Sequence, residues 1–185
     1  MVTVPSPVVV LDFDGNGVPD LAVGNAFGGT LSLLTGAGDG TFRVSAVVAT
    51  GGSPVSVSAG DFNGDGRLDL AAASYDGGVQ VSLNSGNLQR LFGPVTNFPA
   101  GLSPWQLAAA EVDGDEKVDV VVVNNGSNSV GFWGGKGDGT FREVVNYGVG
   151  NSPVGVVIAD FNGDGRADLA VVNYLDGSVS VLLGE

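Results

Sequence analysis

The feature that most constrains this sequence is an acidic nine-residue pattern that occurs four times at nearly constant spacing. Its copies begin at Asp12, Asp61, Glu111 and Asp160, so the intervals are 49, 50 and 49 residues. A fixed period of this length is typical of repeat architectures, in which each repeat is one supersecondary unit that packs against its neighbours. Residues 1–185 are therefore expected to form one domain of four repeats of about 49 residues, at approximately 6–52, 53–102, 103–151 and 152–185, with 1–5 added to the last.

Each copy places oxygen-bearing side chains at its first, third, fifth and ninth positions, and most copies place glycine at the fourth and sixth. Glycine permits the positive φ angles that a tight loop requires, and Ca²⁺ takes six to eight oxygen ligands. The pattern predicts a calcium site in each loop, with the backbone carbonyl of the seventh residue as a further ligand. The predicted ligands are Asp12, Asp14, Asn16, Val18 and Asp20; Asp61, Asn63, Asp65, Arg67 and Asp69; Glu111, Asp113, Asp115, Lys117 and Asp119; and Asp160, Asn162, Asp164, Arg166 and Asp168.

Two other interpretations of the loops are weaker. Hairpin turns favour Asp, Asn and Gly without any metal, but they do not explain a carboxylate at the ninth position, where an apolar strand begins. An EF-hand requires a bidentate glutamate at the twelfth position, and this sequence has valine or alanine there. The third copy departs from the pattern at Glu111 and Glu116, so three or four Ca²⁺ per chain are expected.

The segments around these loops indicate an all-β fold. Each repeat opens on Ser-Pro, as in Ser53-Pro54, and continues through short apolar or alternating runs separated by turn residues. The first three repeats contain four such runs each, and the last contains three. Val2–Val4 has the character of a displaced fourth strand, which would complete four four-stranded blades and close a ring by strand exchange.

Composition excludes several classes of function. The chain has no cysteine and no histidine, which removes disulfides, thiol nucleophiles and histidine-based acid–base catalysis. A net charge of −13 makes nucleic acid and anionic membranes poor partners, and four bound Ca²⁺ would reduce it to −5. No apolar run approaches the roughly 20 residues of a membrane span, and no signal peptide is visible in the first ten residues.

The pattern Asp-Phe-Asn-Gly-Asp-Gly-Arg-x-Asp-Leu-Ala, followed by Gly-Asp-Gly-Thr-Phe, resembles the FG-GAP/VCBS repeats of integrin α-subunit propellers and of many secreted bacterial proteins. The resemblance covers practically the whole chain. It implies a β-propeller whose calcium loops join the first and second strands of each blade, and a role in adhesion or recognition. The ring is either a four-bladed monomer or half of an eight-bladed homodimer closed by Val2–Val4 in trans. The dimer is preferred because relatives favour larger rings.

The turns opposite the calcium loops carry aromatic and amide side chains, which suit sugars or peptide loops. This candidate ligand face comprises Phe27, Tyr75, Trp105, Asn124, Asn125, Asn173 and Tyr174. Packing between blades is the alternative for these residues. We expect Trp133, Phe13, Phe62 and Phe161 to belong to the core.

The sequence thus favours a calcium-binding, non-catalytic module that is secreted, at the cell surface or periplasmic, and that binds an unidentified protein or carbohydrate without inserting into a membrane. An accessory or catalytic domain of a secreted carbohydrate-active enzyme is an alternative, although close carboxylates held on one cation are poorly suited to proton transfer. A structural or synthetic propeller without a ligand is the third.

Overall fold

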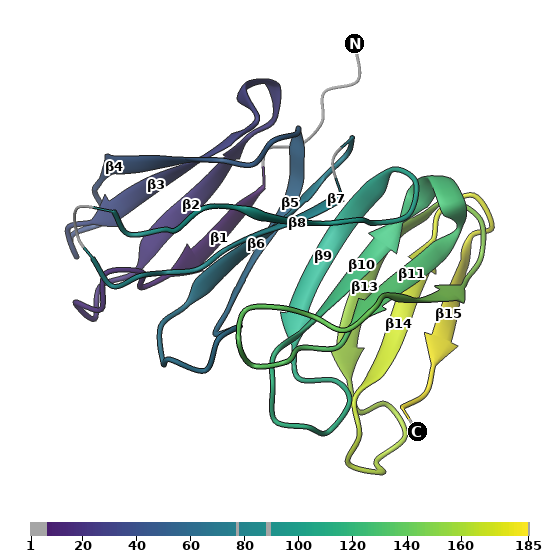
Figure 1. Cartoon of the computed structure of the whole chain (residues 1–185). Coiled ribbons are helices and arrows are strands. Elements are labelled where there is room, and N and C mark those ends of the chain that lie inside the picture. The colour runs from purple at the N-terminus through teal and green to yellow at the C-terminus, as the bar shows by residue number, and fades with distance from the viewer. Residues whose placement is uncertain (1–6, 77, 88–89, 185) are drawn as a thin grey trace.

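A computed structural model describes residues 7–76, 78–87 and 90–184, and within them the chain is all-β, as predicted. Four antiparallel sheets follow one another in chain order (Figure 1), each a meander of strands that are neighbours in sequence. The first sheet contains β1 (Val8–Leu11), β2 (Asp20–Asn25), β3 (Thr30–Gly36) and β4 (Phe42–Ala49), and the second contains β5 (Pro54–Gly60), β6 (Asp69–Ser74), β7 (Gly78–Ser82) and β8 (Thr96–Phe98). The third contains β9 (Pro104–Ala110), β10 (Asp119–Asn124), β11 (Ser129–Trp133) and β12 (Val145–Gly148), and the fourth contains β13 (Pro153–Ala159), β14 (Asp168–Asn173) and β15 (Ser178–Leu182).

The fourth sheet has three strands among the described residues. The predicted exchange of Val2–Val4 lies outside the part of the chain that the structure describes. Two short 3₁₀ turns, η1 (Ala26–Gly28) and η2 (Asn125–Ser127), link the second and third strands of the first and third sheets. Over the described ranges, no helical segment has the length and hydropathy that crossing a bilayer requires.

The second strand of each sheet explains how the sheets stack. Every residue of β6 and of β10 is buried, as their continuous apolar sequences predict for strands covered on both faces. Burial alternates along β2, and β14 has one exposed position, Val172. The difference arises because the first and fourth sheets stand at the ends of the row and have a neighbouring sheet on one side only (Figure 1).

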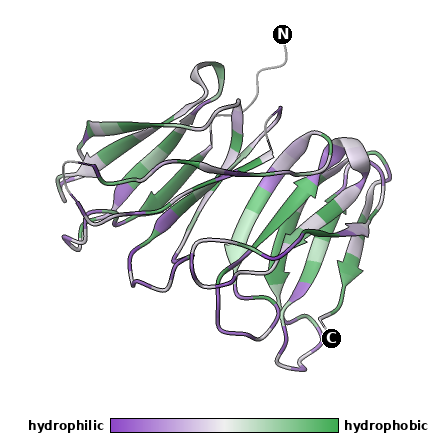
Figure 2. Cartoon of the chain, in the orientation of Figure 1, coloured by the Kyte–Doolittle hydropathy of each residue, from purple (hydrophilic) through white to green (hydrophobic). Residues whose placement is uncertain are grey.

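Three hydrophobic cores join neighbouring sheets, and the apolar strand residues stand out from the polar loops in Figure 2. The core between the first and second sheets contains Leu33 and Leu70, and that between the second and third contains Val81 and Trp133. The third core, which contains Val121 and Leu169, joins the third and fourth sheets. The innermost strands β1, β5, β9 and β13 contact one another in that order.

The expected core aromatics divide into two groups. Trp133, Phe13 and Phe62 are buried, as predicted. Phe161 was predicted to be buried too, but it is 49% exposed. The prediction failed because Phe161 belongs to the last of the four described sheets, and the described residues place no further sheet over it.

Candidate functional site

The four acidic loops connect the first and second strands of their sheets, as the resemblance implied, between β1 and β2, β5 and β6, β9 and β10, and β13 and β14. Glycine stands at positive φ where the loop turns, for example at Gly15 (75°) and Gly17 (82°). The second and fourth loops repeat these angles at the same positions. The sequence pattern therefore imposes one backbone shape on three of the loops.

Side chains of the first loop fold it around its own backbone. In Asp12, Oδ1 accepts the amide of Gly15 at 2.8 Å and Oδ2 accepts the amide of Gly17 at 2.8 Å. Asp14 and Asn16 each accept the backbone amide two residues further on. The same bonds form around Asp61 and Asp160. These oxygens keep further lone pairs, so the bonds position them without using up their capacity as ligands.

The ninth-position aspartate is buried in every copy and ties two distant amides together. Asp20 accepts the amide of Phe13 at 3.1 Å through Oδ2 and the amide of Gly36 at 2.8 Å through Oδ1. Equivalent pairs of bonds are made by Asp69, Asp119 and Asp168. The carboxylate thus fastens the start of the loop to the end of the third strand. These two hydrogen bonds need no metal. They explain why an aspartate recurs at the ninth position, where an apolar strand begins.

Burial and hydrogen bonding move the carboxyl pKa values in opposite directions. Desolvation raises the pKa of Asp69 to about 6, against the opposing effect of its two amide bonds. Desolvation also raises the pKa of Asp119. In the exposed first position of the fourth loop, the hydrogen bond from the Gly165 amide, with others from nearby amides, lowers the pKa of Asp160.

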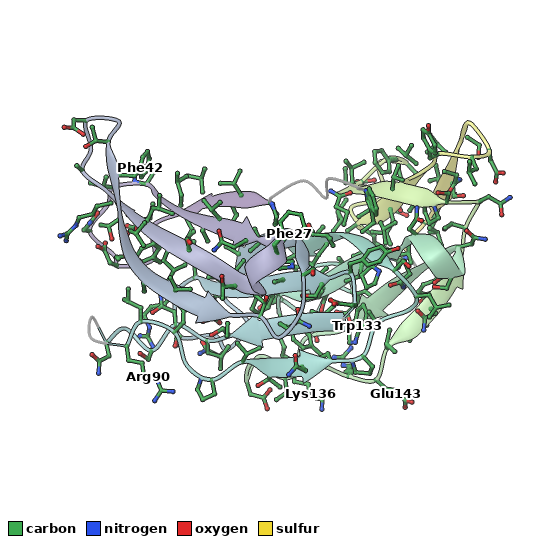
Figure 3. The ribbon with its side chains drawn as sticks, turned by 90° about the horizontal axis from the view of Figure 1, so that it is seen from above. Phe27, Phe42, Arg90, Trp133, Lys136 and Glu143 are labelled. Atoms are coloured by element: carbon green, nitrogen blue, oxygen red, sulfur yellow. The ribbon has the colours of Figure 1, made fainter. Side chains whose placement is uncertain are left out.

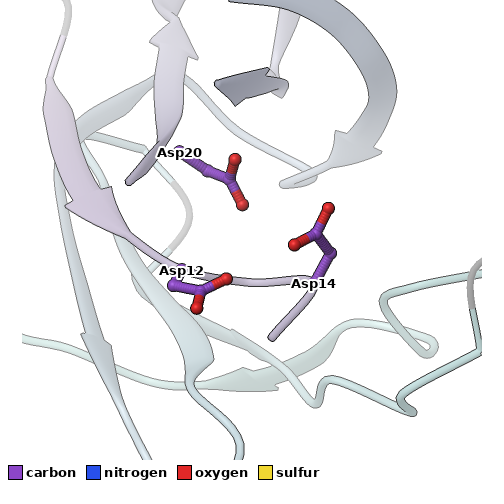
Figure 4. Close-up of side chains that lie close together, drawn as sticks. All are labelled: Asp12, Asp14 and Asp20. Carbon is purple, nitrogen blue, oxygen red and sulfur yellow. The ribbon is translucent and has the colours of Figure 1, made fainter. Parts of the chain in front are cut away.

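The first loop has the donor set that a hard cation requires. Asp12, Asp14 and Asp20 point toward one another (Figure 4), and one carboxylate oxygen from each lies within 4.8 Å of the others. Two oxygens bound to the same Ca²⁺ are at most about 5 Å apart, because each lies about 2.3–2.6 Å from the ion. The residues therefore fit a calcium ion.

The third loop differs because basic side chains occupy its carboxylates. Glu111, Asp113 and Asp115 also bring carboxylate oxygens within 4.8 Å. Arg142, which follows the Gly137–Phe141 hairpin, donates through Nη1 to Asp113 and through Nη2 to Asp115, each at 2.6 Å. Lys117 Nζ lies 3.3 Å from Asp115. A guanidinium thus pairs with two of the three carboxylates that would bind a metal here.

Sequence reasoning did not identify Arg142 as a site residue. An arginine, Arg43, follows the equivalent Gly-Asp-Gly-Thr-Phe hairpin of the first repeat, so the local sequence does not distinguish the two positions. Sequence reasoning did identify Glu116 as a departure from the pattern, and this residue stands at φ 65° in place of the sixth-position glycine, which strains the backbone. The second loop has an internal contact of its own, between Arg67 and Asp65.

The candidate ligand face lies at the other end of the sheets. The Ser-Pro turns pack there beside the turns that follow the second strands, since the amide of Tyr75 donates to the Ser53 carbonyl and that of Tyr174 to the Ser152 carbonyl, each at 3.0 Å. Phe27 is 86% exposed and Tyr174 is 71% exposed, and Tyr75 is exposed too. These three aromatic side chains are available to a ligand.

The amides of this face have a different role from the one expected. Asn124 and Asn173 are buried and donate to serine hydroxyls on the next strand, as Asn173 does to Ser180 at 2.9 Å. Asn125 is half-buried and donates to Ser152 Oγ at 2.8 Å and to the carbonyl of Pro153. Trp105 is also half-buried. The amides therefore brace the turns, and the exposed part of the face is aromatic.

The FG-GAP-like repeat model matches this sequence three times, at residues 12–72, 61–122 and 111–171. Each match begins at one acidic loop and extends past the next. Together the matches cover most of the chain. The search of curated proteins gave no match.

Several solved structures have a similar fold. BBS1N in complex with ARL6DN is 14% identical in two crystals, soaked with mercury (TM-score 0.63) or lead (0.65), and the alignments cover 96% of this chain and 53% or 56% of that one. An Agrocybe aegerita lectin that recognises non-reducing terminal N-acetylglucosamine is 23% identical (TM-score 0.60), with 95% of this chain and 51% of the lectin covered. The chain thus spans about half the length of the structures it matches.

Proposed function

This chain is a member of the FG-GAP-like repeat family, and on that premise we propose that it is a calcium-binding, non-catalytic β-propeller module that serves recognition or adhesion outside the cytosol. The observation that carries the proposal is the convergence of three carboxylates in the first loop, on a backbone shape that the second and fourth loops share. Asp12, Asp14, Asn16 and Asp20, with the Val18 carbonyl, would hold the ion in the first loop.

The chain's own residues supply a preformed cradle. Hydrogen bonds from loop amides fix the orientation of Asp12, Asp61 and Asp160, so binding requires little reorganisation. A bound calcium ion would supply positive charge where carboxylates otherwise repel one another. In the third loop, Arg142 supplies that charge instead. We therefore propose three calcium ions per chain.

The environment follows from the expected affinity. Extracellular calcium modules have dissociation constants of about 10⁻⁴–10⁻³ M. At roughly 2 mM free calcium and a constant near 0.1 mM, each site stabilises the fold by about 1.8 kcal/mol. Three such sites are comparable to the roughly 5–15 kcal/mol stability of a typical domain. The concentration of free calcium in the cytosol is far below such a dissociation constant. This supports a secreted, cell-surface or periplasmic location.

Thermal unfolding with and without calcium tests the metal sites. We expect 2 mM CaCl₂ to raise the Tm of the wild-type protein well above its value in EGTA. The variant Asp164→Asn removes one charge but keeps the Oδ1 acceptor for the Arg166 amide, so its calcium-induced rise in Tm should be smaller. The matched control is Asp39→Asn, since Asp39 accepts the Thr41 amide in the same way outside the calcium loops. An identical Tm in calcium and EGTA would refute the proposal.

The ligand would bind at the exposed aromatic side chains opposite the calcium loops. Aromatic rings pack against sugar faces and peptide loops, and the similar Agrocybe aegerita lectin recognises terminal N-acetylglucosamine. We propose that Phe27, Tyr75 and Tyr174 contact a carbohydrate or protein ligand. A glycan array that includes terminal N-acetylglucosamine, run with wild type and Tyr174→Ala, tests the carbohydrate case, with Leu175→Ala as an exposed control on the same turn.

An activity screen against the glycans that bind separates recognition from catalysis. The proposal predicts binding without turnover. Hydrolysis of a bound glycan by the wild-type protein would show instead that the chain is a catalytic domain.

A further inference from the structure

The two ends of the row of sheets expose faces that are buried at every internal junction. We propose that two copies of this chain join head to tail, with the fourth sheet of each against the first sheet of the other, and so complete a ring of eight sheets. The first and fourth sheets form opposite ends of the molecule in Figure 3. Large apolar side chains stand exposed on both.

The outer face of the first sheet is equivalent, by strand register, to the face of the second sheet that packs against the first sheet. Val8 and Val10 on β1 are exposed, and strand register places Val10 in one row with Leu21 and Leu34. The equivalent row in the second sheet is Ala59, Leu70 and Ser82. There, Leu70 is buried in the core shared with the first sheet, as is Val57, the equivalent of Val8.

The outer face of the fourth sheet is the other half of the same interface. Val181 and Val179 on β15 are exposed, as is Val157 on β13. Their equivalents in the first sheet are Leu33, Leu31 and Val9, which pack against the second sheet. In the second sheet the equivalents of Val181 and Val179 are Val81 and Val79, which pack against the third sheet. The three described strands of the fourth sheet thus present an uncovered contact face.

Aromatic contacts between sheets repeat in the same direction along the chain. Phe13 in the first acidic loop packs edge-to-face on Phe92 of the second repeat, with ring centroids 6.4 Å apart. Phe62 packs in the same way on Phe141 of the third repeat, at 5.6 Å. The fourth loop carries Phe161, which is 49% exposed and belongs to the last of the described sheets.

The first sheet carries the missing partner of Phe161. Phe42 ends the Gly38–Phe42 hairpin as Phe141 ends Gly137–Phe141, and it is 42% exposed at the free end of the first sheet (Figure 3). At the internal junction the Gly139 amide also donates to the Phe62 carbonyl at 2.8 Å. Gly40 is the equivalent of Gly139. One end face therefore carries the Gly40 amide as a hydrogen-bond donor and the other carries the Phe161 carbonyl as its acceptor. The rings of Phe42 and Phe161 form the matching aromatic pair.

A second copy of the chain would cover the end faces of both the first and the fourth sheet. Under twofold symmetry the two head-to-tail junctions are identical, and no end face remains uncovered. The chain covers only 51–56% of each solved structure it resembles, so those chains are nearly twice as long as this one. Exposed apolar faces of this kind are typical of protein interfaces.

Light scattering coupled to size exclusion tests the proposal on the 185-residue chain. We expect a mass of twice the monomer. Val8→Lys and Val181→Lys, on opposite faces, should each weaken dimerisation by about 100-fold or more, because a lysine would be buried without a partner. Both positions are more than half exposed in the single chain, so neither change should lower its own folding stability. Leu102→Lys is the control, since Leu102 is exposed on a turn between the second and third sheets, away from both end faces.

Mixing two variants tests the direction of assembly. Val8→Lys and Val181→Asp place opposite charges on the two halves of one junction, and we expect the mixture to form dimers more tightly than either variant alone. A monomeric wild type, or larger rings or filaments, would overturn the proposal. A dimer that Val8→Lys disrupts but Val181→Lys leaves intact would also overturn it, because it would show first sheet packing on first sheet.

Discussion

At the scale of single residues, the ninth-position aspartates connect the acidic loops to the sheets. Asp20 joins the amide of Phe13 in the loop to the amide of Gly36 at the end of β3, and it is fully buried. A carboxylate that holds two buried amides stabilises the sheet whether or not a cation is bound. Its role in the apo fold can therefore be separated from any role in binding calcium.

Replacing Asp20 should destabilise the protein in the absence of calcium. Asp20→Ala leaves two amide donors without acceptors, at a cost of roughly 2–4 kcal/mol. Urea unfolding in EGTA measures this cost. Asp14→Ala serves as the control because Asp14 accepts only a local loop amide and should cost far less. Equal stabilities for the two variants would contradict the structural role of Asp20.

Asp69 should make the stability of the calcium-free protein depend on pH. Its pKa is raised to about 6 from 3.8 by burial, so the folded state holds a proton that the unfolded state has lost between these values. The contribution of Asp69 to the free energy of unfolding is therefore fully present below pH 3.8. This contribution of roughly 3 kcal/mol is lost as the pH rises to 6. Chemical unfolding in EGTA from pH 4 to 6.5 measures the trend. Asp69→Asn should flatten it, and an unchanged slope would show that Asp69 is not its source.

Arg142 should control the number of calcium ions that bind. Arg142→Gln removes the guanidinium from Asp113 and Asp115, and calorimetric titration should then find one more calcium ion per chain than in wild type. Arg43→Gln changes the equivalent position of the first repeat and should leave the number unchanged. A wild-type count for Arg142→Gln would mean that this arginine does not block the third loop.

At the scale of elements, one loop-and-strand unit repeats, and its departures from regularity are local. The second strands begin at Asp20, Asp69, Asp119 and Asp168 and pair with their neighbours in one register. The third loop is the irregular one, because Glu116 stands at positive φ where the other loops have glycine. A side chain at that angle strains the backbone.

Restoring the glycine should stabilise the third loop. Glu116→Gly removes strain of roughly 1–3 kcal/mol and loses about 0.5–1 kcal/mol to the greater freedom of the unfolded chain, for a net gain of about 1 kcal/mol. The reciprocal change, Gly66→Glu in the second loop, should destabilise by a similar amount. Differential scanning calorimetry of both variants in EGTA measures the two effects. A lower Tm for Glu116→Gly would show that Glu116 makes a stabilising contact that outweighs the strain.

The elements were more predictable from sequence than their contacts. Periodic loops and apolar runs predicted the all-β meanders and the glycine turns, because these depend on local geometry. The reach of Arg142 across 29 residues to Asp113 depends on how the hairpin folds back, which the local sequence does not encode. The exposure of Phe161 depends on the absence of a following sheet, although its sequence context equals that of the buried Phe62.

At the scale of the whole molecule, the proposals of metal binding and of assembly rest on charge and on shape. The net charge of −13 is concentrated in the acidic loops, and three calcium ions would reduce it to −7. Two apolar end faces remain uncovered in the single chain, and the repeat supplies complementary surfaces for them. The proposed metal sites lie within single sheets and the proposed assembly joins different sheets, so we expect that either can be abolished without the other.

Anomalous X-ray diffraction from crystals grown in millimolar calcium tests the proposed metal sites most directly. The account predicts one calcium peak in each of the loops 12–20, 61–69 and 160–168, with Arg142 on the carboxylates of the third loop. Loops without calcium peaks at that concentration would contradict it.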